Sequence, residues 1–253
     1  MMGGKPSDIP FGGACLWRFA GDACCAKRAR DALGSVMAQL GFAPDMIDSG
    51  VLAVSELATN SHQHAGRAAS ASADMVELWV WARTHPRLEL VVAVFDGHRD
   101  VVPCPTPGDV LDEHGKGLGI VGALATAWGW HPSRSRLAAR PVLGKATWFA
   151  LPLPPVWPVP RRVIAPSVAA ERLHSLLGSR GLAVTRRSDA TGISVITSCA
   201  LDIWVTPGWF AWRNGSGYDR HPLLDLQEAA ESVVRKVEAD ARSLATSSEP
   251  RRG

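Results

Sequence analysis

Three polar residues spaced four apart could hold an ion and a phosphate in this sequence. Glu56, Asn60 and His64 lie in residues 55–64, and a helix that repeats every 3.6 residues would place them in one row. Mg²⁺ prefers oxygen ligands and takes few from the protein when a nucleotide supplies the rest. Asn60 could therefore bind the ion, and Glu56 could orient or deprotonate an attacking hydroxyl. An ordinary amphipathic helix with its polar stripe towards water is the alternative.

A run of alternating glycines, Gly115, Gly117 and Gly119, precedes an apolar segment that we expect to form a helix. Such a run exposes backbone N–H groups and lets a phosphate approach closely, and Lys116 adds a cation. The glycines also match the G-x-G-x-x-G dinucleotide fingerprint, but no acidic residue follows at about 20 positions, where that fingerprint needs one. A lid over the phosphates of a nucleotide is the preferred interpretation, and a helix start with a flexible loop is the alternative.

The composition is that of an ordinary globular protein. The 253 residues are 46% hydrophobic and 20% charged, which allows one large or two small packed domains. A net charge of +3 gives no argument for direct nucleic-acid binding. The five cysteines lack C-x-x-C spacing and indicate free thiols, and the histidines near Gln63 lack further ligands at zinc spacing. Without about 18 consecutive apolar residues, a soluble cytoplasmic protein with no membrane partner is expected.

Periodicity and turn residues predict the elements of residues 14–153. Asp22 is expected to cap the first helix, and a proline is expected to open the second. The expected helices span 23–40 and 44–66, with a further apolar helix inside 114–130. The expected strands span 14–20, 75–83, 88–96 and 141–153, with the second and third forming a hairpin.

A proline-rich segment, residues 154–162, predicts a semi-rigid linker and a domain boundary. Residues 163–245 are expected to form a small α+β domain of unknown role. Ser167 is expected to cap a helix there, and the charges of the last helix are interpreted as a solvated face. Most tryptophans at strand positions are interpreted as core residues, and an exposed tryptophan patch that marks a partner surface is the alternative. The expected helices span 168–177 and 223–244, and the expected strands span 181–187, 193–199, 201–206 and 209–213.

Four sequence blocks in order carry a family resemblance. They are ELATN at 56–60, VFDG at 94–97, GKGLGIV at 115–121 and GKATWFALPL at 144–153. Together they resemble the gyrase, heat-shock-chaperone and histidine-kinase type of ATP-binding domain, and more narrowly the bacterial anti-sigma-factor serine-kinase branch and its actinobacterial relatives. The resemblance implies an α+β fold for residues 14–153, a two-layer α/β sandwich of the Bergerat type with a largely antiparallel sheet under helices.

The resemblance also implies residue roles. Glu56 would be the catalytic base or would position the acceptor hydroxyl, and Asn60 would coordinate Mg²⁺ next to ATP. Asp96 would accept a hydrogen bond from the adenine amino group. The remaining nucleotide-binding positions would be Gly97 and Thr147 beside the adenine, and Gly115, Lys116, Gly117, Leu118 and Gly119 in the lid.

The function implied is that of an ATP-binding regulatory protein with ATP and Mg²⁺ as cofactors. It would bind a sigma factor or an anti-sigma-factor antagonist and could phosphorylate a serine on that partner. The resemblance also allows a homodimer, because the kinase branch often dimerises. Two residues depart from the family pattern. His98 stands where a second glycine is usual, and Gln63 stands where relatives usually have a basic residue. A protein-binding module without kinase activity and a small α/β protein with structural glycines are the alternatives.

Overall fold

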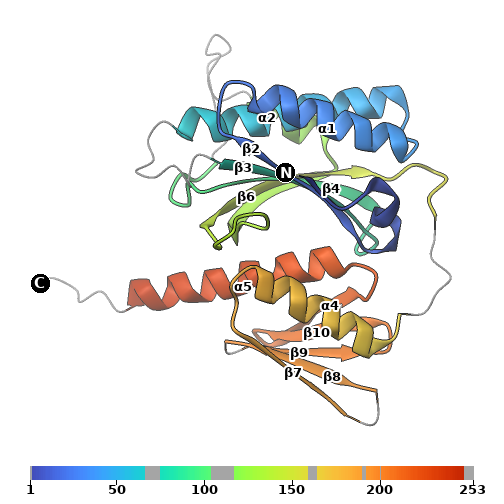
Figure 1. The fold of residues 1–253 in the computed structure, drawn as a ribbon, viewed down its shortest axis with the longest axis vertical. Coiled ribbons are helices and arrows are strands. Elements are labelled where there is room, and N and C mark those ends of the chain that lie inside the picture. The colour runs from blue at the N-terminus through green and yellow to red at the C-terminus, as the bar shows by residue number, and fades with distance from the viewer. Residues whose placement is uncertain are drawn as a thin grey trace, which may run out of the picture. The chain divides into compact units, whose positions relative to one another are not determined.

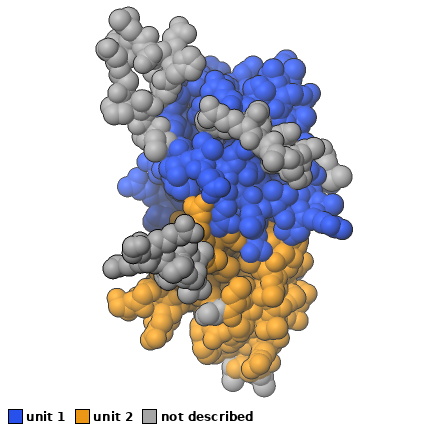
Figure 2. All heavy atoms as spheres, turned by 90° about the vertical axis from the view of Figure 1, so that its left-hand side faces the viewer, with its two compact units in different colours: residues 1–163 blue, residues 164–253 orange. Residues whose placement is uncertain are grey.

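The computed structural model shows two compact units, Met1–Val163 and Ile164–Gly253, so the division falls directly after the proline-rich segment. Figure 1 shows the elements, and Figure 2 colours the two units. Each unit combines helices with one antiparallel sheet, which confirms the expected α+β class with a second small domain. The structure describes residues 2–65, 75–103, 117–158, 164–189, 192–199 and 201–247.

The sheet of the first unit has six antiparallel strands in the order β1-β2-β3-β4-β6-β5. The expected hairpin joins its two central strands, in which Trp79 pairs with Ala93 and Leu78 with Val94. The strands are β1 (Met2–Gly3), β2 (Ala14–Ala20), β3 (Met75–Arg83), β4 (Glu89–Asp96), β5 (Ala127–Arg134) and β6 (Leu143–Pro152).

Helices cover one face of this sheet (Figure 1). Leu33 and Met37 of one helix and Leu57 of the next lie in the same core cluster as Val92 and Phe149 of the sheet. This packing fixes the helix that carries the candidate site against the sheet. The helical segments of the unit are the 3₁₀ turn η1 (Pro6–Phe11) and the helices α1 (Cys25–Gln39), α2 (Pro44–Ala65) and α3 (Gly117–Leu124).

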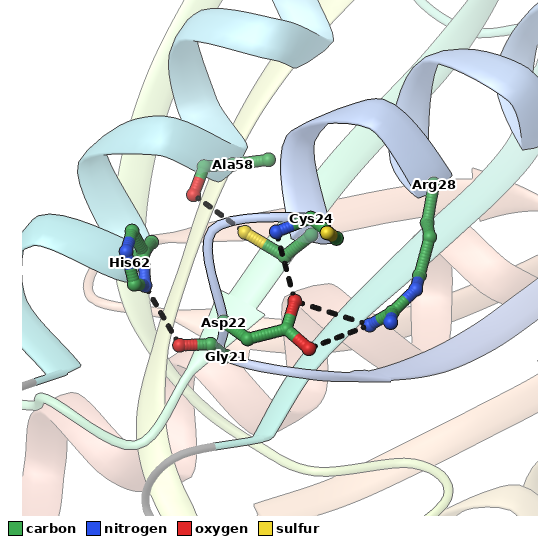
Figure 3. A network of polar contacts seen from close by, with 7 residues as sticks. Gly21, Asp22, Cys24, Arg28, Ala58 and His62 are labelled. Carbon is green, nitrogen blue, oxygen red and sulfur yellow. Dashed lines mark hydrogen bonds and ion pairs between the residues drawn. The ribbon is translucent and has the colours of Figure 1, made fainter.

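The first helix begins at Cys25, two residues later than predicted. Asp22 Oδ1 accepts the Cys24 N–H at 2.9 Å, and both Asp22 carboxylate oxygens accept from Arg28 (Figure 3). Asp22 therefore holds a turn in front of the helix instead of capping it directly. At the other end Gly41 adopts φ +78°, a left-handed conformation that suits glycine and ends the helix as expected.

Strand β5 follows the apolar helix at Ala127 and was not expected from the sequence. Trp128 pairs with Phe149 and Trp130 with Thr147 of β6. Gly129 and Pro132 disfavour a helix here, while alternating aromatic residues favour a strand. The helix therefore ends at Leu124.

The opposite face of the first sheet carries a second apolar cluster around Trp79 and Trp81, which are fully buried as expected of core residues. Trp79 stacks on Phe95 with ring centroids 5.3 Å apart, and the Arg136 guanidinium lies 4.5 Å from the Trp79 ring centroid. Glu77 accepts the Trp79 indole N–H and the Arg136 backbone N–H. Both faces of this sheet are therefore packed.

The second unit is a five-stranded antiparallel meander with two helices on one face (Figure 1). Ile196, Ile203 and Trp212 pair across three neighbouring strands and share one core with both helices. The elements are α4 (Pro166–Ser179), β7 (Val184–Ser188), β8 (Ser194–Ser198), β9 (Leu201–Thr206), β10 (Trp209–Asn214), β11 (Gly217–Pro222) and α5 (Leu226–Ser247).

Several expectations for this unit were wrong. Helix α4 starts at Pro166 with Ala165 as its N-cap, so Ser167 lies inside the helix, as the preference of proline for the first helical position explains. Strand β11 was not expected from its polar sequence. Glu231 on α5 is buried and paired with Arg180, not solvated.

Two tryptophans of the second unit also depart from the expected core placement. Trp204 is 48% exposed and Trp209 41% exposed, whereas Trp212 is fully buried. Strand alternation explains the difference, because Trp212 points to the helix-covered face and the other two point away from it. None of the helices in the described segments has both the length and the apolar composition that a membrane crossing requires.

Candidate functional site

Helix α2 places the two predicted site residues one turn apart. Val54, Leu57 and Ala58 are buried and fix the helix against the core, while Glu56 and Asn60 remain partly exposed. No hydrogen bond from either of these two side chains is found within the described residues. Both groups are therefore available to a ligand. The His64 side chain lies outside the described part of the chain.

The first turn of helix α3 lies against Glu56. A Cβ atom on Gly117 would be 2.5 Å from Glu56 Oε2 and 3.4 Å from Glu56 Cβ, so only glycine allows the two segments to approach this closely without moving the carboxylate. A Cβ on Gly119 would meet nothing within 4 Å, so this glycine faces open space. The structure thus brings the glycine segment and the candidate base together.

The glycine segment differs from the prediction in one respect. Gly117 and Gly119 lie within α3, not in a loop ahead of it, and the Leu118 side chain is buried in the core. Leu118 therefore contributes its side chain to the core and not to a lid. Gly115 and Lys116, the other two predicted lid residues, lie outside the described residues.

Asp96 ends strand β4 directly opposite Lys145 of β6 and is the centre of a buried polar network. Asp96 Oδ1 accepts from Lys145 Nζ at 2.7 Å and from the His98 N–H at 2.9 Å. Lys145 Nζ also donates to the His98 carbonyl at 2.9 Å. The Gly97–His98 turn, where the sequence departs from the family pattern, is thus folded around this ion pair.

The second oxygen of Asp96 has a different environment. Ser61 Oγ on α2 lies 3.0 Å from Asp96 Oδ2 and 3.1 Å from the Leu57 carbonyl. A hydroxyl has a single proton to donate, so Ser61 can serve one of these oxygens at a time. A carboxylate has about four lone-pair positions, and three donors already occupy this one. The remaining acceptor position lies on Oδ2, which could accept a hydrogen bond from an amino group.

Thr147 lies on the same face of the sheet as Asp96, two residue pairs further along. It pairs with Val94 where Lys145 pairs with Asp96, and it is only 6% exposed. Helix α2 contacts β4, β6 and α3. It therefore joins the Asp96 end of the site, through Ser61, to the Glu56 end.

Sequence reasoning missed Ser61 and Lys145. A lysine inside the otherwise apolar strand GKATWFALPL was a usable signal, because a buried lysine almost always needs a charged partner. Ser61 gave no such signal, since a serine beside Asn60 fits an exposed helix face equally well.

Further contacts anchor helix α2 to the turn before α1 (Figure 3). His62 Nδ1 lies 2.7 Å from the Gly21 carbonyl, and Cys25 Sγ donates to the Ala58 carbonyl at 3.4 Å. Burial is the main cause that raises the pKa of the Cys25 thiol, which keeps it protonated as a donor. On the preceding turn of α2, Arg30 of α1 donates to Ser55 Oγ at 2.7 Å.

Residues 21–139 match the family model of the histidine kinase-like ATPase domain. The matched segment contains Glu56, Asn60, Asp96 and the glycine segment, and it ends before strand β6. This similarity supports ATP binding by the first unit, and no curated protein sequence matches the chain. The narrower resemblance to anti-sigma-factor serine kinases stays a prediction.

Proposed function

We propose that the first unit binds Mg-ATP as a regulatory switch, docks on a sigma factor or an anti-sigma-factor antagonist, and phosphorylates a serine of that partner. The observation that carries this proposal is the position of Glu56, which lies against Gly117 at the start of α3 and one helical turn from Asn60. A carboxylate beside a glycine-rich helix start is where an acceptor hydroxyl and a phosphate would have to meet.

The residues present fit ATP and Mg²⁺. The Asn60 amide supplies the oxygen ligand that Mg²⁺ prefers, and its side chain makes no hydrogen bond to the described residues. The open space beside Gly119 leaves room for a phosphate near backbone N–H groups. Asp96 Oδ2, with Ser61 as its single donor, would accept the adenine amino group, and Gly97 and Thr147 would line the same end.

In the proposed transfer, Glu56 would hold the serine hydroxyl of the partner and take its proton while the serine oxygen bonds to the terminal phosphorus of ATP, the bond from that phosphorus to the bridging oxygen breaks, and ADP leaves. Mg²⁺, when bound, would neutralise phosphate charge. Asn60 would hold the ion from the same helix that carries Glu56, one turn away in sequence. The short approach at Gly117 keeps the Glu56 carboxylate next to the phosphate-binding backbone.

A binding module without kinase activity is the second candidate, and one observation favours it. Lys145 and Ser61 already occupy Asp96, which is only 2% exposed. When a carboxylate already accepts hydrogen bonds from its own chain, a new hydrogen bond from adenine adds less binding free energy. In this case the first unit would dock on its partner, as a monomer or a homodimer, with or without nucleotide.

Thermal unfolding of the whole chain with and without Mg-ATP tests nucleotide binding. A ligand at 100 times its Kd should stabilise the native state by about 2.7 kcal/mol. We expect this shift in the wild type and its loss in Asn60→Ala and Asp96→Asn. Asp48→Ala, which removes an exposed carboxylate from the same helix, is the matched control and should keep the shift. A wild type that does not respond to millimolar Mg-ATP would overturn the proposal.

Transfer of labelled phosphate to a candidate partner encoded beside the gene separates the two candidates. Glu56→Gln should keep the Mg-ATP stabilisation and lose transfer, because the amide cannot take a proton. Wild-type binding of ATP and partner without transfer would favour the binding module.

A further inference from the structure

The second unit has one bare sheet face. Helices α4 and α5 pack on the face that carries Ile196, Ile203 and Trp212. On the other face every described side chain is exposed or partly exposed. A monomer rarely leaves a sheet face with several large aromatic side chains uncovered unless something binds there.

Strand pairing places a defined set of residues on this face. Arg187, Val195, Trp204, Ala211 and Arg220 are directly opposite one another across all five strands. A second row holds Thr206, Trp209 and Pro222, and on the other side of the first row lie Thr197, Asp202, Arg213 and Tyr218. Side chains paired in this way project to the same side of a sheet. We call this surface the Trp204 face.

The aromatic side chains are well exposed on this face. Trp204, Trp209 and Tyr218 are 48%, 41% and 59% exposed. Small residues, Val195 and Ala211, lie on either side of Trp204 in its row. The centre of the face is therefore apolar and flat, with one indole standing between two short side chains.

The charge of the face is positive. Arg187, Arg213 and Arg220 are exposed, and within the described part of the chain none of their guanidinium groups has an ion pair or a hydrogen bond. Among the described residues of this face Asp202 is acidic, and its carboxylate accepts a hydrogen bond from the Thr197 hydroxyl at 2.7 Å. The arginines occupy β7 on one edge and the β10–β11 hairpin on the other, so they flank the apolar centre.

Protection of sheet edges explains only part of this pattern. Charged residues on edge strands hinder strand-to-strand aggregation, which would account for Arg187 and Arg220. It does not account for Trp204, because β9 is the central strand of the sheet. Trp, Tyr and Arg are the residue types that dominate protein–protein binding energy, and an apolar centre with a polar rim is the usual anatomy of such an interface.

We propose that the Trp204 face is a docking surface for an acidic surface of a partner protein. The carboxylates of the partner would pair with the flanking arginines, and an apolar side chain would cover Trp204. Single-stranded nucleic acid is less suited to this arrangement, because it requires positive charge that follows its backbone, whereas here the arginines stand on opposite edges. The proposal concerns the second unit and is independent of nucleotide binding.

Fluorescence anisotropy of a labelled peptide in which glutamate alternates with leucine tests the proposal on the whole chain without nucleotide. We expect saturable binding at low salt that weakens about tenfold in Trp204→Ala and in the double variant Arg187→Gln/Arg220→Gln. Arg172→Gln, which removes an exposed arginine from α4, is the matched control and should bind as the wild type does. The unfolding midpoint of each variant is also measured. If Trp204→Ala proves to be destabilised, the binding of the double arginine variant decides the test.

Several outcomes would overturn the proposal. These are no saturable binding at millimolar peptide, equal binding of a peptide with glutamine in place of glutamate, or an equal loss in the Arg172 control. Tighter binding of a thymidine oligonucleotide that responds to the same variants would assign the face to nucleic acid instead. Because ATP is absent from this experiment, none of these results bears on the function proposed for the first unit.

Discussion

Both units contain a buried ion pair, and the two pairs differ in their surroundings. Lys145–Asp96 of the first unit joins neighbouring strands at a sheet end, where Asp96 also has Ser61 and the His98 N–H as donors. Arg180–Glu231 of the second unit joins the residue after helix α4 to helix α5 inside the core. The first carboxylate retains acceptor capacity beside partly exposed site residues. Asp96 can therefore take part in ligand binding, whereas the Arg180–Glu231 pair joins two helical segments inside a core.

Breaking the pair of the second unit should have the largest effect. Arg180→Met leaves Glu231 buried without its guanidinium and should lower the free energy of unfolding by about 3–5 kcal/mol. The double variant Arg180→Met/Glu231→Leu should recover most of this loss, because an apolar replacement removes both desolvated charges. Chemical denaturation measures both. A double variant as unstable as the single one would mean that the pair does more than pack.

Breaking the pair of the first unit should cost less. Lys145→Met should lower the free energy of unfolding by about 3 kcal/mol or somewhat less, because Asp96 keeps the hydrogen bonds from Ser61 and His98. Denaturation compared with Lys145→Met/Asp96→Leu measures the part due to the uncompensated carboxylate. A larger loss than in Arg180→Met would reverse the comparison.

Alkaline pH should affect the first unit before the second. Burial, with a smaller contribution from Asp8, raises the pKa of the fully buried Cys15 thiol to about 11 from a usual 9.0. The raised pKa in the folded state means that the stability it contributes is complete below pH 9 and is lost as pH rises from about 9 towards 11. The loss should be about 3 kcal/mol, because each pKa unit corresponds to about 1.4 kcal/mol. Denaturation against pH measures it, with Cys15→Ala as the control that removes the Cys15 part of the dependence and leaves the part due to Cys25.

The smallest change tests the openness of the site beside the first pair. Gly117→Ala should change the free energy of unfolding by less than about 1 kcal/mol, because the helix gains from alanine while the mobile end of Glu56 moves aside. The displaced carboxylate should lower any phosphate transfer. Gly119→Ala, which meets nothing within 4 Å, should leave transfer unchanged. A loss above 2 kcal/mol for Gly117→Ala would show that Glu56 cannot move.

Local patterns were enough to predict much of the first unit. Strands β2 and β3 have the predicted bounds, and α2 begins at Pro44 as expected, because the apolar pattern and the proline act over short distances in sequence. The Glu56–Asn60 spacing on α2 was predicted for the same reason. The approach of Gly117 to Glu56 could not be, since it depends on how two separate helices pack.

The errors share a physical cause. Lys145 and Asp96 are 49 residues apart, and Arg180 and Glu231 are 51 apart, so neither ion pair leaves a local pattern. Glu231 resembles any charged residue of an exposed helix face until its partner is known. Strand β5 was missed because its apolar residues fit a helix as well as a strand, and pairing with β6 decides between them.

The row that crosses the second sheet also sets a length. Arg187 and Arg220 are separated by four strand spacings, which at about 4.8 Å each amounts to about 19 Å. Two acidic groups on one helix would need about 13 residues between them to span this distance, at 1.5 Å per residue. In the proposed docking, this spacing would favour a partner whose acidic groups lie about 19 Å apart over a compact ligand whose charges lie closer together.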